Sequence, residues 1–227
     1  MSLLGKLINY DDPSSIGFKL RSKRIKGFLS LVNDLYIRNG KVEIIDIGGT
    51  RAYWKILPMD FLDLNNVTIY LLNMPGTNIT SKEERFKYIE GDGCDLSGYK
   101  SNSFDIVHSN SVIEHVGDWG EMLKFSKEIR RLAKCYYIQT PNYWFPIEPH
   151  CVTPFFHWLP KPFRVALIMR FSLGNWARRN SVSEAVLAVE SAKLLDYKMF
   201  KELFYDAELS REKVMFLSKS LIAIKKN

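Results

Sequence analysis

The sequence predicts an α/β fold, with a mostly parallel seven-stranded sheet, helices on both faces, an antiparallel C-terminal hairpin and a helical lid insert. Two observations carry this prediction. Between residues 20 and 140, short apolar runs typical of buried strands alternate with segments whose apolar residues recur at helical spacing. Near the C-terminus, two strand-like runs lie too close together for a crossover connection, so we expect them to pair antiparallel.

The first part of the chain supplies the alternating elements in order. We expect a helix over residues 20–37, because Asn39-Gly40 follows it as a stop signal. The remaining elements are strands at 42–47, 67–72, 86–89, 104–108 and 135–139, and helices at 51–62, interrupted near Pro58, and at 121–131. Strands and helices that alternate through short loops favour a parallel sheet.

The pattern changes after Thr140. Residues 141–162 are rich in proline and aromatic side chains, and 163–192 have a helical pattern. A helix at 198–205 and strands at 214–217 and 221–224, joined at 218–220, complete the chain. We therefore expect one domain over 1–227, with a cofactor-binding core at 20–140, a lid or acceptor insert at 141–195 and a C-terminal helix and hairpin at 196–227.

Composition narrows the class of protein. A chain of 227 residues with 46% apolar side chains can bury a full core. The net charge is +7, but the basic residues are spread along the chain, so no nucleic-acid partner is expected. Three cysteines without a repeating spacing predict neither a disulfide framework nor a metal site. Neither a signal-peptide pattern nor an apolar run of about 18 residues occurs, so we expect a soluble, cytoplasmic protein.

The first predicted strand ends in a glycine turn. In an open parallel sheet, ligands bind beyond the carboxyl ends of the strands. Gly48 and Gly49 let the backbone turn sharply and let a ligand approach, and the helix that follows offers free N–H groups. Thr50 and Tyr53 stand where a dinucleotide fingerprint needs glycine, which disfavours a pyrophosphate cofactor. A plain strand-to-helix turn is the alternative interpretation of this segment.

Polar residues also follow the next three strands. Asn73 offers one acceptor and two donors to a ribose diol. Asp92 can accept from an adenine amino group, with a glycine on either side leaving room for a flat ring; an Asx-type turn is the alternative. The fourth strand is followed by the polar stretch 109–111 and then by Glu114-His115.

Together these four strand ends resemble the class I S-adenosylmethionine-dependent methyltransferases, especially the type 11 branch, over about residues 42–140. The resemblance implies a Rossmann-like, doubly wound fold, S-adenosylmethionine as cofactor and S-adenosylhomocysteine as product. It implies that the glycine turn wraps the methionine moiety, the second strand end holds the ribose and the third meets the adenine. The implied cofactor-binding residues are Asp46, Gly48, Gly49, Thr50, Asn73, Met74, Asp92, Gly93, Cys94, Asn110 and Ser111. Two departures from the family pattern are a short glycine turn and an asparagine, Asn73, in place of the usual acid.

A second, narrower resemblance covers residues 140–150, which look like a segment of bacterial methyltransferases of polysaccharide and glycan biosynthesis. The segment follows the fifth strand, so we expect it to roof the cofactor pocket. Tyr143, Trp144 and Phe145 suit a sugar or isoprenoid face, or they pack the lid against the sheet. The acceptor implied is a small molecule, sugar- or lipid-linked, that is methylated on oxygen.

Alignment of donor and acceptor can supply about 7–11 kcal/mol of barrier reduction, and a general base about 3–5 kcal/mol. His115 and His150 are the candidate bases, because imidazole titrates near neutral pH. Glu148 is expected to orient His150 or to contact acceptor hydroxyls. The structural alternatives are a hydrogen bond from His115 to the turn after the fourth strand, and a solvated loop acid at Glu148.

Other interpretations compete with a methyltransferase. A methyltransferase-like domain that has lost catalysis and acts as a binding or scaffold protein is consistent with Asn73 and the short glycine turn. A nicotinamide-dependent reductase is disfavoured by the missing glycines. The apolar stretch 162–171, followed by Arg178-Arg179, suggests either a helix on a membrane surface or a lid helix buried between the aromatic segment and the sheet, and we expect the lid.

Overall fold

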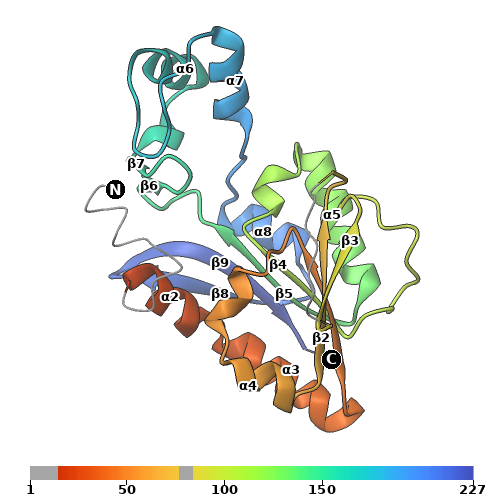
Figure 1. Ribbon diagram of the computed structural model, residues 1–227. Helices are drawn as coiled ribbons and strands as arrows, with labels where there is room; N and C mark the ends of the chain where they lie inside the picture. The colour runs from red at the N-terminus through yellow and green to blue at the C-terminus, as the bar shows by residue number, and fades with distance from the viewer. Residues whose placement is uncertain (1–14, 77–83, 227) are drawn as a thin grey trace.

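The computed structural model describes residues 15–76 and 84–226, and it contains a seven-stranded sheet in the order β3-β2-β1-β4-β5-β9-β8 (Figure 1). The first five strands are parallel, β9 is antiparallel to β5, and β8 is antiparallel to β9. The strands are β1 (Val42–Ile47), β2 (Val67–Asn73), β3 (Phe86–Glu90), β4 (Ile106–Asn110), β5 (Cys135–Pro141), β8 (Glu208–Val214) and β9 (Leu217–Lys225). The predicted fold class is confirmed.

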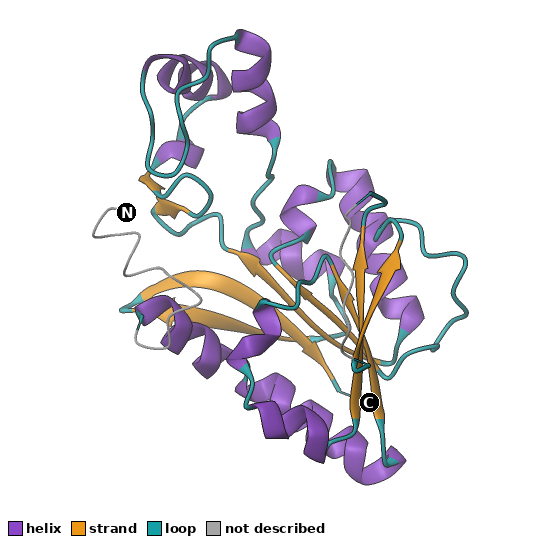
Figure 2. Cartoon of the chain, viewed as in Figure 1, coloured by secondary structure: helices purple, strands orange, loops and turns teal. Residues whose placement is uncertain are grey.

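Helices cover both faces of this sheet (Figure 2). One face carries α2 (Ile16–Arg24), α3 (Lys26–Asn39), the short 3₁₀ helix η1 (Tyr53–Ile56) and α4 (Met59–Leu64), and the other carries α5 (Trp119–Leu132) and α8 (Tyr197–Leu203). The strand β1 shows why both layers form. Ile44 packs into the core under α3, and its neighbour Ile45 packs into the core under α5. Successive strand residues face opposite ways, so a run that is apolar throughout needs cover on both faces.

Several predicted elements differ in their bounds. The helix expected at 20–37 is divided at Ile25 into α2 and α3. The helix expected at 51–62 becomes η1 and α4, because Pro58 has an extended backbone between them. The fourth strand begins at Ile106 rather than at residue 104, and a short 3₁₀ helix, η2 (Ile113–His115), follows it.

The C-terminal hairpin turns earlier than predicted. The structure pairs Val214 with Leu217, so the chain reverses at Met215 and Phe216, within the run expected to be one strand. The predicted connection at 218–220 lies inside β9. The apolar run 214–217 was wrongly taken for a strand because exposed apolar side chains sit on this turn, where Phe216 is 93% exposed.

The lid insert forms a layer of its own above the carboxyl edge of the sheet (Figure 1). It comprises β6 (Ile147–Glu148), β7 (Thr153–Pro154), the 3₁₀ helix η3 (Phe156–Trp158), α6 (Lys161–Arg170) and α7 (Val182–Glu190). Its buried side chains, among them Phe156, Ile168 and Val189, form a separate cluster. The expectation that α6 is buried against the sheet is therefore wrong, since α6 packs on α7 instead. Within the described ranges, helices fall short of the length and apolar character needed to cross a bilayer.

Candidate functional site

The glycine turn after β1 is held tightly by its surroundings. Gly48 has a φ of +71°, which favours glycine, and its N–H donates to the carbonyl of Leu72 at 2.7 Å. A Cβ on Gly49 would lie 1.8 Å from Oδ2 of Asp46. The side chain of Asn73 donates from Nδ2 to the carbonyl of Gly49 at 2.9 Å, which ties the end of β2 to the turn. The fold itself therefore requires both glycines.

The carboxylate of Asp46 points into the protein and is 1% exposed. Its Oδ1 lies 2.7 Å from Nδ1 of His108, and its Oδ2 accepts from Nε1 of Trp54 at 2.8 Å. The other ring nitrogen of His108 lies 3.2 Å from the hydroxyl of Tyr53. Burial raises the pKa of Tyr53 to about 12, so this hydroxyl stays neutral. These contacts favour a role for Asp46 in holding the turn, instead of the predicted contact with the cofactor.

The predicted adenine-binding segment forms an Asx turn. Oδ1 of the exposed Asp92 accepts from the backbone N–H of Cys94 at 2.9 Å, which leaves the other carboxylate oxygen toward solvent. Gly93 packs between Ile47 and Phe125, where a Cβ would come within 2.8 Å of each. Burial, reinforced by the charge of Asp92, raises the pKa of Cys94 to about 12, so its thiol is neutral. Of the other predicted residues, Thr50 lies in the glycine turn and Met74 is 58% exposed at the end of β2.

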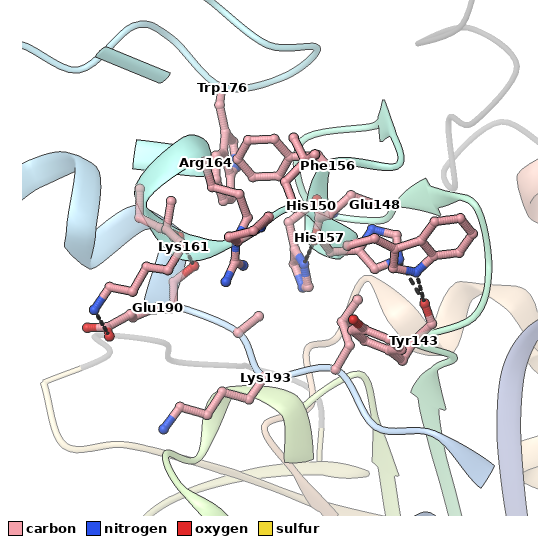
Figure 3. A pocket seen from close by; sticks show the side chains of 18 residues that line it. Tyr143, Glu148, His150, Phe156, His157, Lys161, Arg164, Trp176, Glu190 and Lys193 are labelled. Carbon is pink, nitrogen blue, oxygen red and sulfur yellow. Dashed lines mark hydrogen bonds and ion pairs between the residues drawn. The ribbon is translucent and has the colours of Figure 1, made fainter. Parts of the chain in front are cut away.

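Two cavities lie beyond the carboxyl ends of β4 and β5. The strand-end cavity, of about 410 Å³, is lined by residues that include Arg24, Asn110, Ser111, Glu114, His115 and Phe145. The lid cavity, of about 450 Å³, is lined by residues that include Tyr143, His157, Trp158, Lys161, Arg164 and Trp176 (Figure 3). Glu148 and His150 line both cavities. The predicted aromatic roof is thus divided, because Tyr143 faces one cavity, Phe145 the other, and Trp144 is 62% exposed.

The three predicted catalytic residues come together where these cavities share their lining. Nδ1 of His150 lies 2.6 Å from Oε1 of Glu148, whose Oε2 accepts from the backbone N–H groups of His150 and Cys151 at 2.8 and 2.6 Å. Nδ1 of His115 lies 2.7 Å from the carbonyl of Ser191. The two histidines approach each other, with their Nε2 atoms 3.2 Å apart. We call Glu114, His115, Glu148 and His150 the histidine cluster.

Burial and neighbouring charges shift the pKa values of this cluster in opposite directions. Burial alone would raise the pKa of Glu148, but the hydrogen bonds from His150 and Cys151 outweigh it and lower the pKa. Burial alone would lower the pKa of His150, but its hydrogen bond to Glu148 and the charges of Glu148 and Glu114 raise it. Glu114 is 1% exposed, and burial raises its pKa. Its Oε2 accepts from the hydroxyl of Thr140 at 2.9 Å.

Sequence reasoning missed three residues of the strand-end cavity. Arg24 donates from Nη2 to Oδ1 of Asn110 at 2.9 Å, although the two residues are 86 positions apart. Gln139 accepts from the hydroxyl of Ser111 at 3.0 Å. The sequence analysis noted Glu114 as part of the Glu114-His115 pair, but it did not predict that this carboxyl group is buried. Nothing in the local sequence around Arg24 distinguishes it from the neighbouring basic residues of α2.

The lid cavity combines aromatic faces with basic groups (Figure 3). His157 and Trp158 both bond through ring nitrogens to the carbonyl of Tyr143, at 2.8 and 2.9 Å. Lys161 forms an ion pair with Glu190 at the rim. Burial lowers the pKa of His157, so its ring is neutral, and its Nδ1 is a buried acceptor without a hydrogen-bond partner in the described part of the chain. Nε of Arg164 is a buried donor that also has no hydrogen-bond partner among the described residues.

Residues 60–135 match the family model described as a methyltransferase domain. No curated protein matches the chain. Two solved carbon methyltransferases, CurJ and DszA, are 11% and 12% identical with TM-scores of 0.61 and 0.59, and they cover 100% and 98% of this chain. The chain spans 59% and 57% of their lengths.

A third solved structure has nearly the same extent as this chain. An S-adenosylmethionine-dependent methyltransferase from Archaeoglobus fulgidus is 12% identical with a TM-score of 0.53, covering 91% of this chain and 94% of its own. At such low identity these likenesses show the fold. The family match covers residues 60–135, and the solved structures share the fold of this chain.

Proposed function

We propose that this chain transfers a methyl group from S-adenosylmethionine to an oxygen atom of a small, glycan-related acceptor. One observation carries the proposal: the histidine cluster lines a cavity at the carboxyl ends of β4 and β5, beside the strand ends that the resemblance assigns to the cofactor. This is the edge where open α/β sheets bind their ligands. The match to the methyltransferase family model supports the reaction class.

The strand ends offer groups that suit the cofactor. The ends of β1, β2 and β3 are neighbours, since Ile47 pairs with Leu72 and Asn73 pairs with Glu90. The amide oxygen of Asn73 can accept from a ribose hydroxyl, and the exposed carboxylate of Asp92 can accept from the adenine amino group. We assign the cofactor to this edge, with the Gly48-Gly49 turn and Thr50 beside the methionine moiety and with Met74, Gly93 and Cys94 flanking the nucleoside.

The cofactor supplies a methyl group that is already activated by its sulfonium, so the main task of the protein is alignment. Asn110 and Ser111 line the cavity next to the assigned cofactor edge, and they are held there by Arg24 and Gln139. An acceptor hydroxyl set against His115 and His150 would pass its proton to the Nε2 atom of one of these imidazoles. The carbon–sulfur bond breaks as the carbon–oxygen bond forms, and the sulfonium becomes a neutral thioether.

We propose that residues 141–195 form the acceptor-binding insert of a single domain. Tyr143, Trp158 and Trp176 line the lid cavity, and aromatic side chains suit the apolar faces of a sugar or an isoprenoid. Lys161 and Arg164 line the same cavity and would attract an acidic group on the acceptor.

Methyl transfer can be tested with cofactor carrying an isotopic label in its methyl group. The protein would be incubated with monosaccharides, nucleotide sugars and polyprenyl-phosphate-linked sugars, and the products analysed by mass spectrometry. We expect the labelled methyl group to be bonded to an oxygen, as a methyl ether or methyl ester, in one glycan class. Saturating cofactor binding with no label transferred across the panel would contradict the proposed acceptor class, and label on carbon or nitrogen would contradict the proposed reaction.

A further inference from the structure

The two histidines of the cluster face each other with ring nitrogens that cannot both be neutral acceptors at this distance. Nδ1 of His115 contacts a carbonyl oxygen, which only accepts, so this nitrogen carries the proton. Nδ1 of His150 contacts the carboxylate of Glu148 and carries a proton for the same reason. In the neutral rings, the lone pairs on the two Nε2 atoms then point into a gap of 3.2 Å. Such an arrangement needs either a proton on one of the two nitrogens or a metal ion between them.

A buried carboxylate completes the set. Glu114 is 1% exposed, and its Oε1 has no hydrogen-bond partner among the described residues. One carboxylate oxygen of Glu114 and one ring nitrogen from each of His115 and His150 all lie within 4.8 Å of one another. An uncompensated acceptor so deeply buried is costly, and a bound cation removes that cost. Both Glu114 and the histidines line the strand-end cavity, so an ion here could be reached from solvent.

The distances favour a metal ion of transition-metal type. Zinc lies about 2.0–2.1 Å from imidazole nitrogens, so two nitrogens on one ion at angles of about 90–110° are about 2.9–3.4 Å apart. The observed 3.2 Å falls in this range. The three ligand atoms lie within 4.8 Å of one another, close to the span of about 4.2 Å that two ligand atoms on one ion can reach, so a small movement of the carboxylate closes the site. Glu148 and the carbonyl of Ser191 would orient the imidazoles, as outer-shell groups do in metal sites.

We infer that Glu114, His115 and His150 bind one divalent metal ion of the zinc, cobalt or iron type. Two imidazoles and one carboxylate suit these ions and leave coordination positions open toward the strand-end cavity. The inference departs from the sequence-based expectation of no metal site. Ion binding does not depend on methyl transfer. In a further suggestion, which rests on the proposed function, the acceptor hydroxyl would bind the ion and lose its proton to solvent, because the metal would occupy both imidazole Nε2 atoms.

Titration of the chelator-stripped full chain with Zn²⁺ in a calorimeter tests the inference. We expect one ion per chain at micromolar or lower Kd, and an affinity loss of at least about 100-fold in His115→Asn and His150→Asn. His157→Asn is the matched control, because His157 is a buried histidine of the lid cavity outside the cluster, and it should bind Zn²⁺ like the wild type. The absence of binding by the wild type, or equal binding by wild type and His150→Asn, would overturn the inference.

A second measurement avoids the risk that a variant fails to fold. Co²⁺ added to the stripped wild type should give visible d–d absorption bands that saturate at one ion per chain and disappear when Zn²⁺ is added. A proton shared between the two imidazoles is the competing account of the 3.2 Å contact. Saturating Co²⁺ without such bands, together with a shared N–H···N proton in the NMR spectrum, would establish that account and exclude the metal site. Neither measurement of ion binding requires methyltransferase activity. The metal site can therefore be tested even if the acceptor assay shows no methyl transfer.

Discussion

The guanidinium of Arg24 donates from Nη2 to Oδ1 of Asn110 across 2.9 Å, and so fixes a residue of the predicted cofactor site from helix α2. The same guanidinium pairs through Nη1 with Glu212 at 3.1 Å. The two side chains of this ion pair are 8% and 7% exposed, so it is a buried pair. Removing one partner of a buried pair leaves the other without compensation, which is more costly than losing a surface pair.

We therefore expect Arg24→Ala to lower the free energy of unfolding by about 3–5 kcal/mol, measured by urea denaturation. Lys41→Ala is the matched control, because Lys41 pairs with Glu43 at 3.7 Å and is 63% exposed. It should change stability by less than about 1 kcal/mol. The double variant Arg24→Ala/Glu212→Ala should recover part of the loss. If Arg24→Ala and Lys41→Ala lowered the stability equally, the assignment of Arg24 to a stabilising buried ion pair would be contradicted.

Gly49→Ala tests the packing of the glycine turn. The added Cβ would lie 1.8 Å from a carboxylate oxygen that is itself held by Trp54, so the turn has to open. We expect a loss of at least about 1–3 kcal/mol in thermal or urea unfolding. Gly98→Ala is the control, because nothing lies within 4 Å of the position of its Cβ. A wild-type melting curve for Gly49→Ala would show that the turn is looser than described.

Asp46→Asn separates a structural role from a cofactor contact. The amide keeps one acceptor but sets an N–H₂ group against either His108 or Trp54, both of which are bonded to the carboxylate. We expect a loss of about 1.5–3 kcal/mol in stability. The folded fraction should still bind S-adenosylhomocysteine. Unchanged stability with lost binding would restore the direct contact with the cofactor that the sequence suggested.

Glu148→Gln tests the positioning of His150. Glutamine retains one oxygen for the backbone N–H groups of the turn but no longer offers a charged acceptor to the imidazole. Once an acceptor is in hand, we expect kcat to fall by about 100-fold while the acceptor KM and the affinity for S-adenosylhomocysteine change little. Glu202→Gln, which changes an exposed carboxylate of α8 outside both cavities, should leave all three values unchanged. A rise in KM alone would assign Glu148 to acceptor binding.

The sheet was predictable because its strands are apolar runs buried on both faces, as Val42–Ile47 illustrates. The site was predictable only where it follows the strand ends in the chain. Asn110 and Ser111 belong to this class, since they lie at the end of β4. Side-chain direction was not predictable, because in a strand covered on both faces the alternation does not tell which face Asp46 occupies. Its register partner in β4, His108, decides that question.

Contacts between residues far apart in the chain also could not be predicted from the sequence. His115 bonds to the carbonyl of Ser191, which is 76 residues away, and its approach to His150 depends on how the lid returns to the sheet. The sequence did identify all three predicted catalytic residues as candidates, because each is a titratable group after a strand. It could not show that they meet, nor that Glu114 is buried beside them.

Calorimetric titration with S-adenosylhomocysteine tests most directly whether the carboxyl ends of β1, β2 and β3 bind S-adenosylmethionine. We expect one site per chain with micromolar affinity, and an affinity at least about 10-fold lower in Asp92→Ala, whose melting temperature should fall only slightly because the exposed side chain makes one hydrogen bond, to the backbone of Cys94. Asp95→Ala, which removes an exposed carboxylate of the same loop, should bind like the wild type. No heat of binding and no thermal shift with millimolar S-adenosylhomocysteine or S-adenosylmethionine would contradict the account.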